Sequence, residues 1–401
     1  MRIGDGVKKK IIFIIPSMRS GGAEKSLITL LSLIDYERFD VDLLLFRQDG
    51  LFIKEIPEKV HLIGNTKNYE IFDGDAKKAA KYFLKKLKFG SAFARYKYAK
   101  AINSSDEYFR ASQSWKYLKK QLPKIHGKYD VAVGYLEGNA SRFAVDEVNS
   151  DIKIVYVHND ITKLNMSKKF NAEIFKKADK IVTVSSECAD ALRREYCEYN
   201  NKIEIIENIV SPALLKKSAG KETVFDKSDG KIHLLTIGRC FEQKNIPLAV
   251  RTCKLLKDRG RQIKWYHIGS GPLESQIKNM ISELDLQNEF VMLGERENPY
   301  PYIGQCDIYV QTSKYEGKSI AVDEAKCLNR PIVVTNFSTV YDQISDEENG
   351  LIAEMNEESL AEKIEKLIDS PEMRKNFCET LKNEALGNEN ELEKFYKITE
   401  A

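Results

Sequence analysis

The stretch "KIHLLTIGRCFEQKN", residues 231–245, restarts a pattern that the first half of the chain has already used. An apolar run ends at a glycine, and a polar loop then leads into a helical pattern near 246–259. The same unit occurs at "KIIFIIPS", residues 10–17, which a helical pattern from about 23 to 34 follows. Continuous apolar runs are typical of strands that are buried on both faces. The sequence therefore predicts two similar α/β halves.

Further strands are predicted in each half, with helical patterns between most of them. They are "DVDLLLF", "DVAVGYL", "IKIVYVHN" and "KIVTVSS" in the first half, and "IKWYHIGSG", "EFVMLG", "DIYVQTS" and "RPIVVTN" in the second. Alternating strands and helices predict parallel sheets with helices on both faces. A polar stretch at 211–230 separates the two series. We therefore predict two Rossmann-like domains, residues 1–212 and 213–386, with a C-terminal helix near 387–401 that packs back onto the first.

Composition excludes several classes of protein. The chain has 401 residues, 42% hydrophobic content and a net charge of +3, which suits a folded protein of two domains. Its seven cysteines show no C-x-x-C spacing, so we interpret them as reduced thiols of a cytoplasmic protein. The apolar run 11–15 is too short for a signal peptide, and no stretch approaches the ~20 apolar residues of a membrane-spanning helix.

Four junctions between a strand and a helix have the chemistry of an anion site. At "PSMRSGGAEKS", residues 16–26, Gly21 and Gly22 open a helix, where backbone N–H groups can approach a phosphate. A plain turn is the alternative. The glycine spacing fits neither a dinucleotide fingerprint nor a P-loop, so a dinucleotide oxidoreductase is disfavoured.

The next two junctions lie in the second half. Arg239 and Lys244 follow a strand and could grip a diphosphate, although loop cations are often simply solvated. "IGSGPLE", residues 268–274, is a turn of small residues that leads into a helix, and it is equally compatible with an ordinary tight turn.

The fourth junction is "SKYEGKSIAVDEAK", residues 313–326. Gly317, Lys318 and Ser319 precede a helix predicted from about 320 to 328, so their N–H groups would be free at its positive end. Glu316 would lie in the loop before the helix. Glu324, eight residues later, could accept hydrogen bonds from vicinal hydroxyls such as those of ribose.

Taken together, these stretches resemble the retaining glycosyltransferases of family 4 (glycosyl transferases group 1), which have the GT-B fold. The resemblance runs in order through "FIIPSMRSGGAEKSLITLL", "YVHND", "VTVSSE", "ENIV", "TIGRCFEQKN", "HIGSGP", "VMLGE" and "YEGKSIAVDEA". It implies two Rossmann-like domains that face each other across a cleft. The C-terminal domain would bind a nucleotide-sugar donor, and the N-terminal domain would bind the acceptor.

The resemblance also implies roles for individual residues. Arg239 and Lys244 would neutralise the diphosphate, which the loop of Gly21 and Gly22 would approach, and Glu324 would hold the ribose. The remaining positions are His158 and Glu316 at the transferred sugar, Gly317, Lys318 and Ser319 at the phosphates, the backbone from Gly294 to Arg296 at the base, and Asn208 near the hinge. The usual E-G-F-G is "EGKS" here, so Lys318 could add charge at the diphosphate or select the sugar.

The predicted activity is transfer of a sugar, with retention, from a nucleoside diphosphate to a glycan. A UDP-sugar is favoured over a GDP-sugar, and a lipid-linked acceptor in surface polysaccharide synthesis is expected. The alternative is a non-catalytic GT-B partner of an active enzyme. Same-face attack, assisted by the donor phosphate, would need neither cofactor nor metal. The D-x-D triplets at 40–42 and 73–75 are interpreted as structural.

Residues 76–125 differ from the rest of the chain in charge. They hold 14 Lys and Arg against two acids, Asp106 and Glu107, a net charge of +12. "AKKAAKYFLKKLKFG" predicts a basic amphipathic helix whose apolar face is formed by Ala76, Ala80, Phe83, Leu84 and Leu87. A solvated helix face, a peripheral contact with the inner face of the cell membrane and a nucleic-acid surface all remain open. Nucleic acid is disfavoured because no recognised module is present.

Overall fold

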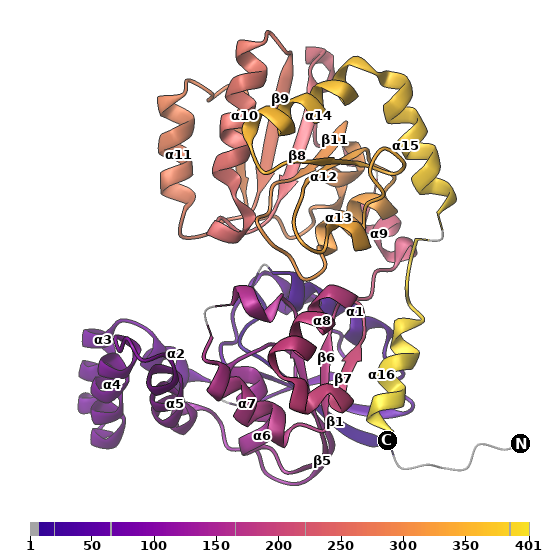
Figure 1. Cartoon of the computed structure of the whole chain (residues 1–401). Coiled ribbons are helices and arrows are strands. Elements are labelled where there is room, and N and C mark those ends of the chain that lie inside the picture. The colour runs from indigo at the N-terminus through magenta and orange to yellow at the C-terminus, as the bar shows by residue number, and fades with distance from the viewer. Residues whose placement is uncertain are drawn as a thin grey trace, which may run out of the picture.

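The structure, a computed structural model, describes residues 8–19, 21–64, 66–164, 166–220, 222–384 and 386–400. Two α/β halves are stacked on each other, and the chain passes between them twice on one side (Figure 1). Each half is built on one sheet, and the strands that pair in these residues are parallel. The predicted pair of Rossmann-like folds is confirmed. Residues 1–7, part of the segment predicted not to be a signal peptide, lie outside the described residues.

The N-terminal sheet has the strand order β3-β2-β1-β4-β5-β6-β7. Its strands are β1 (Lys9–Ile15), β2 (Phe39–Leu45), β3 (Val60–Ile63), β4 (Tyr129–Gly134), β5 (Ser150–Val157), β6 (Lys180–Thr183) and β7 (Ile203–Ile205). The C-terminal sheet has the order β10-β9-β8-β11-β12-β13. Its strands are β8 (Ile232–Ile237), β9 (Ile263–Ile268), β10 (Phe290–Gly294), β11 (Ile308–Gln311), β12 (Ile332–Thr335) and β13 (Leu351–Ala353).

Helices cover both faces of each sheet. Those of the N-terminal half are α1 (Gly22–Leu33), α2 (Lys67–Asp73), α3 (Ala76–Lys85), α4 (Phe89–Ile102), α5 (Glu107–Leu118), α6 (Asn139–Glu147), α7 (Lys168–Lys177) and α8 (Ser186–Glu195). The later helices are α9 (Pro212–Ala219), α10 (Ile246–Asp258), α11 (Glu274–Glu283), α12 (Tyr300–Gln305), α13 (Ile320–Cys327), α14 (Glu357–Asp369), α15 (Pro371–Asn383) and α16 (Glu391–Thr399). Short 3-10 helices are η1 (Leu51–Glu55), η2 (Lys119–Gln121), η3 (Ile161–Lys163), η4 (Cys197–Lys202), η5 (Lys227–Asp229), η6 (Glu242–Lys244) and η7 (Val340–Asp342).

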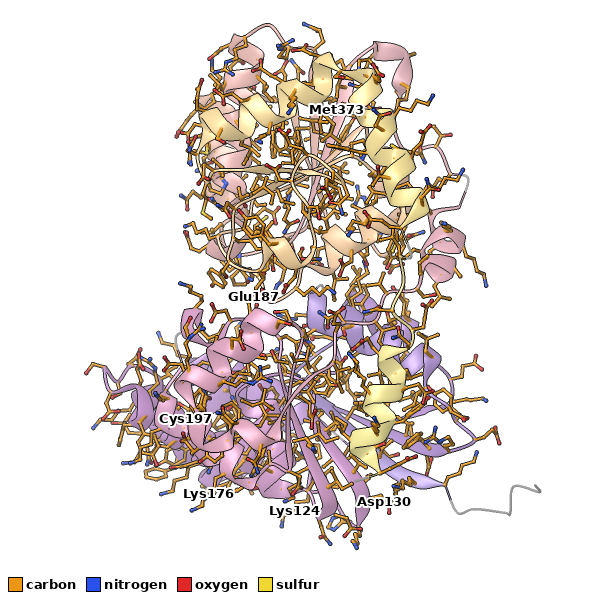
Figure 2. All side chains as sticks on the ribbon, turned by 45° about the vertical axis from the view of Figure 1, so that its right-hand side comes forward. Lys124, Asp130, Lys176, Glu187, Cys197 and Met373 are labelled. Atoms are coloured by element: carbon orange, nitrogen blue, oxygen red, sulfur yellow. The ribbon has the colours of Figure 1, made fainter. Side chains whose placement is uncertain are left out.

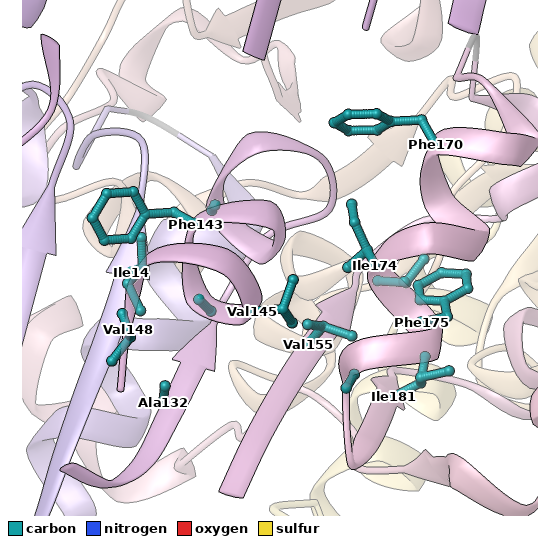
Figure 3. Packing of buried hydrophobic residues seen from close by; sticks show 14 of the residues in the cluster. Ile14, Ala132, Phe143, Val145, Val148, Val155, Phe170, Ile174, Phe175 and Ile181 are labelled. Atoms are coloured by element: carbon teal, nitrogen blue, oxygen red, sulfur yellow. The ribbon is translucent and has the colours of Figure 1, made fainter. Parts of the chain in front are cut away.

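The first strand shows why the apolar runs are continuous. Ile12 and Ile14 of β1 pack into the core on one face of the sheet, while Ile11, Phe13 and Ile15 pack into the core on the other. Figure 3 shows the first of these cores, where α6 and α7 place side chains such as Phe143 and Ile174 beside the strands. Because alternate residues of a strand point to opposite faces, a strand between two helical layers must be apolar throughout.

Three strands have no counterpart among the predicted ones: β3, β7 and β13. Each has only three or four residues and lies at an edge of its sheet. Edge strands pair on one side only, and His61 and Leu62 of β3 are exposed. The segment β3 lacks a continuous apolar run because it is partly exposed, whereas β13 is buried but has only three residues, too few to stand out as a strand.

The last helix, α16, lies on the N-terminal half although it ends the chain (Figure 1). Its Phe395 stacks on Phe13 with a ring-centroid distance of 5.9 Å, and its Tyr396 stacks on Phe39 at 5.5 Å. The two crossings between the halves are tied together, because Val210 donates its N–H to the Asn388 side chain at 2.8 Å. The division at residue 212 stays a prediction.

The basic segment forms α3, α4 and α5, which project from the side of the N-terminal half (Figure 1). The predicted apolar face is wrong in part. Helix α3 ends at Lys85, and Leu87 has a positive φ of 56°, so Leu87 lies outside the helix. Ala79 and Phe83 are the buried positions of α3, whereas Ala76, Leu84 and Leu87 are exposed.

We predict that Phe395→Ala lowers the free energy of unfolding by about 3–5 kcal/mol, because the ring is fully buried against β1. Chemical denaturation measures this directly. Phe109→Ala, at a ring that is 48% exposed on α5, is the matched control and should have little effect. Equal stability of the two variants would contradict the packing of α16.

Candidate active site

An open cavity lies between the carboxyl ends of the two sheets. Its empty space is about 1240 Å³, counted with the solvent at its mouth. Residues of both halves line it, including Glu24, Lys25, His158, Asn159, Asn208, Gly238, Arg239, Gln243, Lys244, Glu295, Arg296, Glu316, Ser319, Ile320, Ala321 and Glu324. In each sheet the strand order reverses, between β1 and β4 and between β8 and β11. Ligands of doubly wound folds bind at such switch points, so the fold itself predicts this place.

Glu316 lies in the loop after β11 and is only 5% exposed. Its Oε1 accepts hydrogen bonds from Ser313 Oγ at 2.5 Å and Gln311 Nε2 at 3.0 Å, and it pairs with Lys244 Nζ at 2.5 Å. Its Oε2 accepts a bond from Gln243 at 3.4 Å. Four polar partners hold the Glu316 carboxylate rigidly in place.

Glu324, in α13, is 2% exposed. Its Oε1 is 2.6 Å from Lys25 Nζ and accepts a hydrogen bond from Tyr300 OH at 3.2 Å. Lys25 belongs to α1 of the N-terminal half, so this ion pair joins the two halves. Burial alone would lower the pKa of the Lys25 ammonium, but the Glu324 carboxylate beside it raises that pKa above its usual value.

The two predicted phosphate cations both line the cavity. Arg239 follows β8 directly and is exposed, with its guanidinium 4.9 Å from the centroid of the Phe241 ring. Lys244 ends η6, and its alkyl chain packs on Gly238. The first two residues of α13, Ile320 and Ala321, also line the cavity, and their N–H groups have no partner within the helix. Positive groups thus reach the cavity from three directions.

At Gly317 the backbones of the two halves are in close contact. A Cβ added there would overlap the carbonyl oxygen of His158 and would lie 3.2 Å from the Cα of Asn159. Only glycine fits this contact between the loop after β11 and the loop after β5. The predicted glycines of the first loop are less constrained: a Cβ at Gly22 would make an ordinary 3.6 Å contact with Ile320, and one at Gly21 would meet only the movable Glu24 carboxylate.

His158 is buried at the end of β5 and lines the cavity. Its Nε2 lies 3.1 Å from the Tyr135 carbonyl oxygen, which can only accept, so Nε2 carries the proton and Nδ1 is a free acceptor. Burial lowers the pKa of the ring, which favours this neutral form. Within the described residues neither His158 Nδ1 nor the Oδ1 atom of Asn208 has a hydrogen-bond partner. A sugar hydroxyl could satisfy either atom.

Lys318 and Ser319 already have partners. The Lys318 ammonium pairs with Glu207 of the N-terminal half, and the Ser319 N–H donates to Gln343 Oε1 at 2.8 Å. The expectation that all three N–H groups of 317–319 are free is therefore wrong for Ser319. Lys318 ties the two halves together in this structure, so its charge is compensated before any ligand arrives.

Of the three residues predicted to lie against the base, two line the cavity. Glu295 and Arg296 line it, whereas Gly294 ends β10 with a φ of 70° and is not among the lining residues. A positive φ favours glycine there for the backbone turn rather than for a direct contact.

The polar residues of the site that were not predicted include Glu24, Lys25, Glu137 and Gln243. Glu137 accepts bonds from the His158 N–H at 3.1 Å and the Asn159 side chain at 3.0 Å. Gln243 then bonds Asn159 at 3.3 Å, so a polar chain crosses between the halves. Glu24 and Lys25 follow the predicted Gly21 and Gly22 closely in the sequence. This proximity was the one sequence feature that could have indicated that they belong to the site.

Aspartates of the two D-x-D triplets, at 40–42 and 73–75, make structural hydrogen bonds. Asp42 accepts a 2.5 Å bond from Tyr129 OH, and Asp75 caps α3. Among the described residues no group of three or more His, Cys, Asp or Glu is suited to hold a metal ion, and the seven cysteines are free. None of the helices described is both long and apolar enough to span a bilayer.

Comparisons with known proteins show which proteins this chain resembles. Residues 221–384 match the family described as glycosyl transferases group 1. The N-acetylgalactosamine-N,N'-diacetylbacillosaminyl-diphospho-undecaprenol 4-alpha-N-acetylgalactosaminyltransferase of Campylobacter jejuni is 25% identical over 380 residues, 94% of this chain and 95% of the relative.

Two groups of solved structures share the fold. A TarM mutant of S. aureus, in complex with Fondaparinux, alpha-GlcNAc-glycerol and UDP, has a TM-score of 0.69 at 15% identity and covers 98% of this chain and 100% of its own. Anabaena Alr3699/HepE with UDP-glucose has a TM-score of 0.68 at 15% identity and covers 98% of each chain. The protein is therefore a glycosyltransferase with the GT-B fold, and its residues 221–384 match group 1.

We predict that Gly317→Ala pushes the walls of the cavity apart, because the new methyl group overlaps the His158 carbonyl. The cost should be about 1–3 kcal/mol of unfolding free energy, with an increased radius of gyration in small-angle scattering. Gly90→Ala, where a Cβ meets nothing within 4 Å, is the control. A Gly317→Ala protein with unchanged stability and dimensions would contradict the close approach.

Proposed function

We propose that this enzyme is a retaining transferase that moves a hexose or N-acetylhexosamine from a UDP-sugar to a lipid-linked glycan during surface polysaccharide synthesis. The observation that carries the proposal is the meeting of Arg239, Lys244 and the start of α13 with the buried Glu324 in one cavity. Two cations and a helix N-terminus suit a diphosphate, and a carboxylate suits the two hydroxyls of ribose.

Uridine as the base is supported by the related structures. The TarM and HepE structures of the same fold contain UDP or UDP-glucose, and this chain superposes on nearly their whole length. The proposed donor position in this protein follows: diphosphate at Arg239 and Lys244, ribose at Glu324, and base beside Glu295 and Arg296. The transferred sugar would then reach His158 Nδ1 and Glu316.

Departure of UDP builds negative charge on the leaving oxygen. Arg239, Lys244 and the N–H groups of Ile320 and Ala321 would stabilise that charge without reorganisation. Glu316 is a poor nucleophile because both of its oxygens already accept hydrogen bonds and one pairs with Lys244. Attack from the face that UDP leaves, with a phosphate oxygen taking the acceptor proton, therefore accounts for retention better than a covalent intermediate on Glu316.

The lipid-linked acceptor is supported by the Campylobacter relative, whose name gives a diphospho-undecaprenol glycan as its substrate. A membrane contact is supported by the surface of α3 and α4. Leu84, Leu87, Phe89, Phe93 and Tyr96 are between 50% and 75% exposed there. Phe89, Phe93 and Tyr96 follow helical spacing on α4 and share one face. Exposed lysines such as Lys81, Lys85 and Lys86 surround them.

Exposed apolar and aromatic side chains ringed by lysine favour an anionic bilayer: the apolar groups enter the interface and the lysines attract the headgroups. We call the five side chains Leu84, Leu87, Phe89, Phe93 and Tyr96 the α3–α4 surface. We propose this surface, instead of the predicted apolar face, as the region of peripheral contact, which would lie at the turn between α3 and α4.

The donor assignment predicts that UDP raises the melting temperature more than GDP, ADP or NAD does. Arg239→Met should lower kcat about a hundredfold, about 3 kcal/mol in the barrier, because one stabilising charge is lost. Lys254→Met removes an exposed cation of α10 that pairs with Asp258, and it should leave the rate unchanged. Rates within twofold for both variants would refute the role of Arg239, and a shift with NAD alone would refute the nucleotide-sugar site.

The membrane assignment predicts that Leu87→Glu with Phe93→Glu weakens binding to phosphatidylglycerol vesicles at least tenfold, since each apolar side chain contributes about 1.5–3 kcal/mol on burial. Vesicle flotation measures the loss. Leu214→Glu with Met355→Glu, at side chains that are 40% and 39% exposed, adds the same charge elsewhere and is the control. Undiminished flotation, or retention on RNA instead of vesicles, would contradict a membrane role for the α3–α4 surface.

A further inference from the structure

The carboxylate proposed to hold the donor ribose is already occupied. Glu324 Oε1 lies 2.6 Å from Lys25 Nζ, and Tyr300 OH donates to the same oxygen at 3.2 Å. The Lys25 ammonium also lies 4.3 Å from the centroid of the Tyr300 ring, which adds a cation–π contact. Lys25 and Glu324 both line the cavity, so this cluster forms part of its wall.

The cluster is buried as well as paired. The side chains of Lys25 and Glu324 are 16% and 3% exposed. A carboxylate at this depth needs a compensating partner, because removing one member of a buried ion pair leaves an uncompensated charge. Without a ligand, Lys25 is the cation that fills this need. Its position on α1 means that the N-terminal half neutralises a group of the C-terminal half.

Ribose and lysine would bind Glu324 in different ways. A lysine ammonium offers one compact charge, whereas two vicinal hydroxyls are held by both carboxylate oxygens. Lys25 and Tyr300 both contact Oε1, so a ribose held by both carboxylate oxygens would have to displace one of them from Oε1.

We propose that Lys25 determines donor affinity, by occupying Glu324 in the ligand-free enzyme and yielding it to the ribose when the nucleotide binds. The inference rests on the proposed role of Glu324 in the donor site. A ligand that must displace an internal group binds with its affinity reduced by the stability of that occupied state. Donor binding and the contact of α1 with α13 are thereby linked.

A second ion pair between the halves provides the comparison. Lys54 of η1 lies 3.2 Å from Glu297, with the two side chains 79% and 62% exposed. It joins the same two halves but does not line the cavity. Substitution of Lys54 therefore removes an ion pair between the halves but leaves Glu324 paired with Lys25.

The experiment is titration calorimetry with UDP on the full-length chain. Lys25→Met should lower the dissociation constant about tenfold, about 1.4 kcal/mol, and should also lower the melting temperature of the ligand-free protein. Lys25→Gln disturbs the fold less and should shift affinity in the same direction by a smaller factor. Lys54→Met should bind UDP as the wild type does. Titration with 2′,3′-dideoxy-UDP should abolish the gain, because this probe has no hydroxyls for Glu324.

Unchanged or weaker UDP binding by both Lys25 variants would overturn the inference, as would an equal gain with the dideoxy probe. Glu324→Gln separates this failure from that of the proposed donor site. If Glu324→Gln weakens UDP binding while the Lys25 variants do not tighten it, the donor site stands and Lys25 is only structural. If Glu324→Gln also leaves UDP binding unchanged, the donor site itself is wrong.

Discussion

Two buried carboxylates need compensating charge where the halves of this chain meet, and much of the cleft follows from that requirement. Glu316 and Glu324 are 5% and 2% exposed. Each has a lysine: Lys244 from its own half and Lys25 from the other. Buried charges are tolerated only with good partners. The two lysines therefore pair with the carboxylates that we propose as contacts of the substrate.

The fold brings these groups together through the way in which its two sheets face each other. Parallel sheets end their strands on one side, and two such ends face each other, so that loops after β1, β5, β8 and β11 share one cavity. Gly317 allows the backbone of one loop to touch the carbonyl of His158 in the other. Beyond the cleft, the crossings at Val210 and Asn388 and the docking of α16 connect the halves. The contacts between the halves and the charge pairs of the cleft are consequently parts of one arrangement.

The sequence predicted the parts of this molecule whose signals are local. Central strands such as β1 and β8 were found because burial on both faces makes them wholly apolar, and the short edge strand β3 was missed because it is not. Arg239 and Lys244 follow β8 in the chain, and Glu316 and Glu324 follow β11, so their position at the carboxyl ends of these strands could be predicted locally, and all four line the cavity. The partner of Glu324 was missed because Lys25 lies about 300 residues away, and no local pattern indicates which distant cation will neutralise it.

Two other errors have similar causes. The apolar face predicted across residues 76–87 assumed one continuous helix, but α3 ends at Lys85 and the chain turns at Leu87. Lys318 was expected near phosphate, yet it reaches Glu207, a contact that depends on how the halves are placed. Residue types and spacing therefore predicted where the site lies, while the pairing of charges across it required the three-dimensional structure.

A crystal structure of this protein with UDP tests the central claim most directly. The account predicts density for the diphosphate between Arg239, Lys244 and the first turn of α13, both ribose hydroxyls on Glu324, and the Lys25 ammonium moved away from that carboxylate. A nucleotide bound elsewhere, or a ribose that leaves the Lys25–Glu324 pair intact, would contradict it.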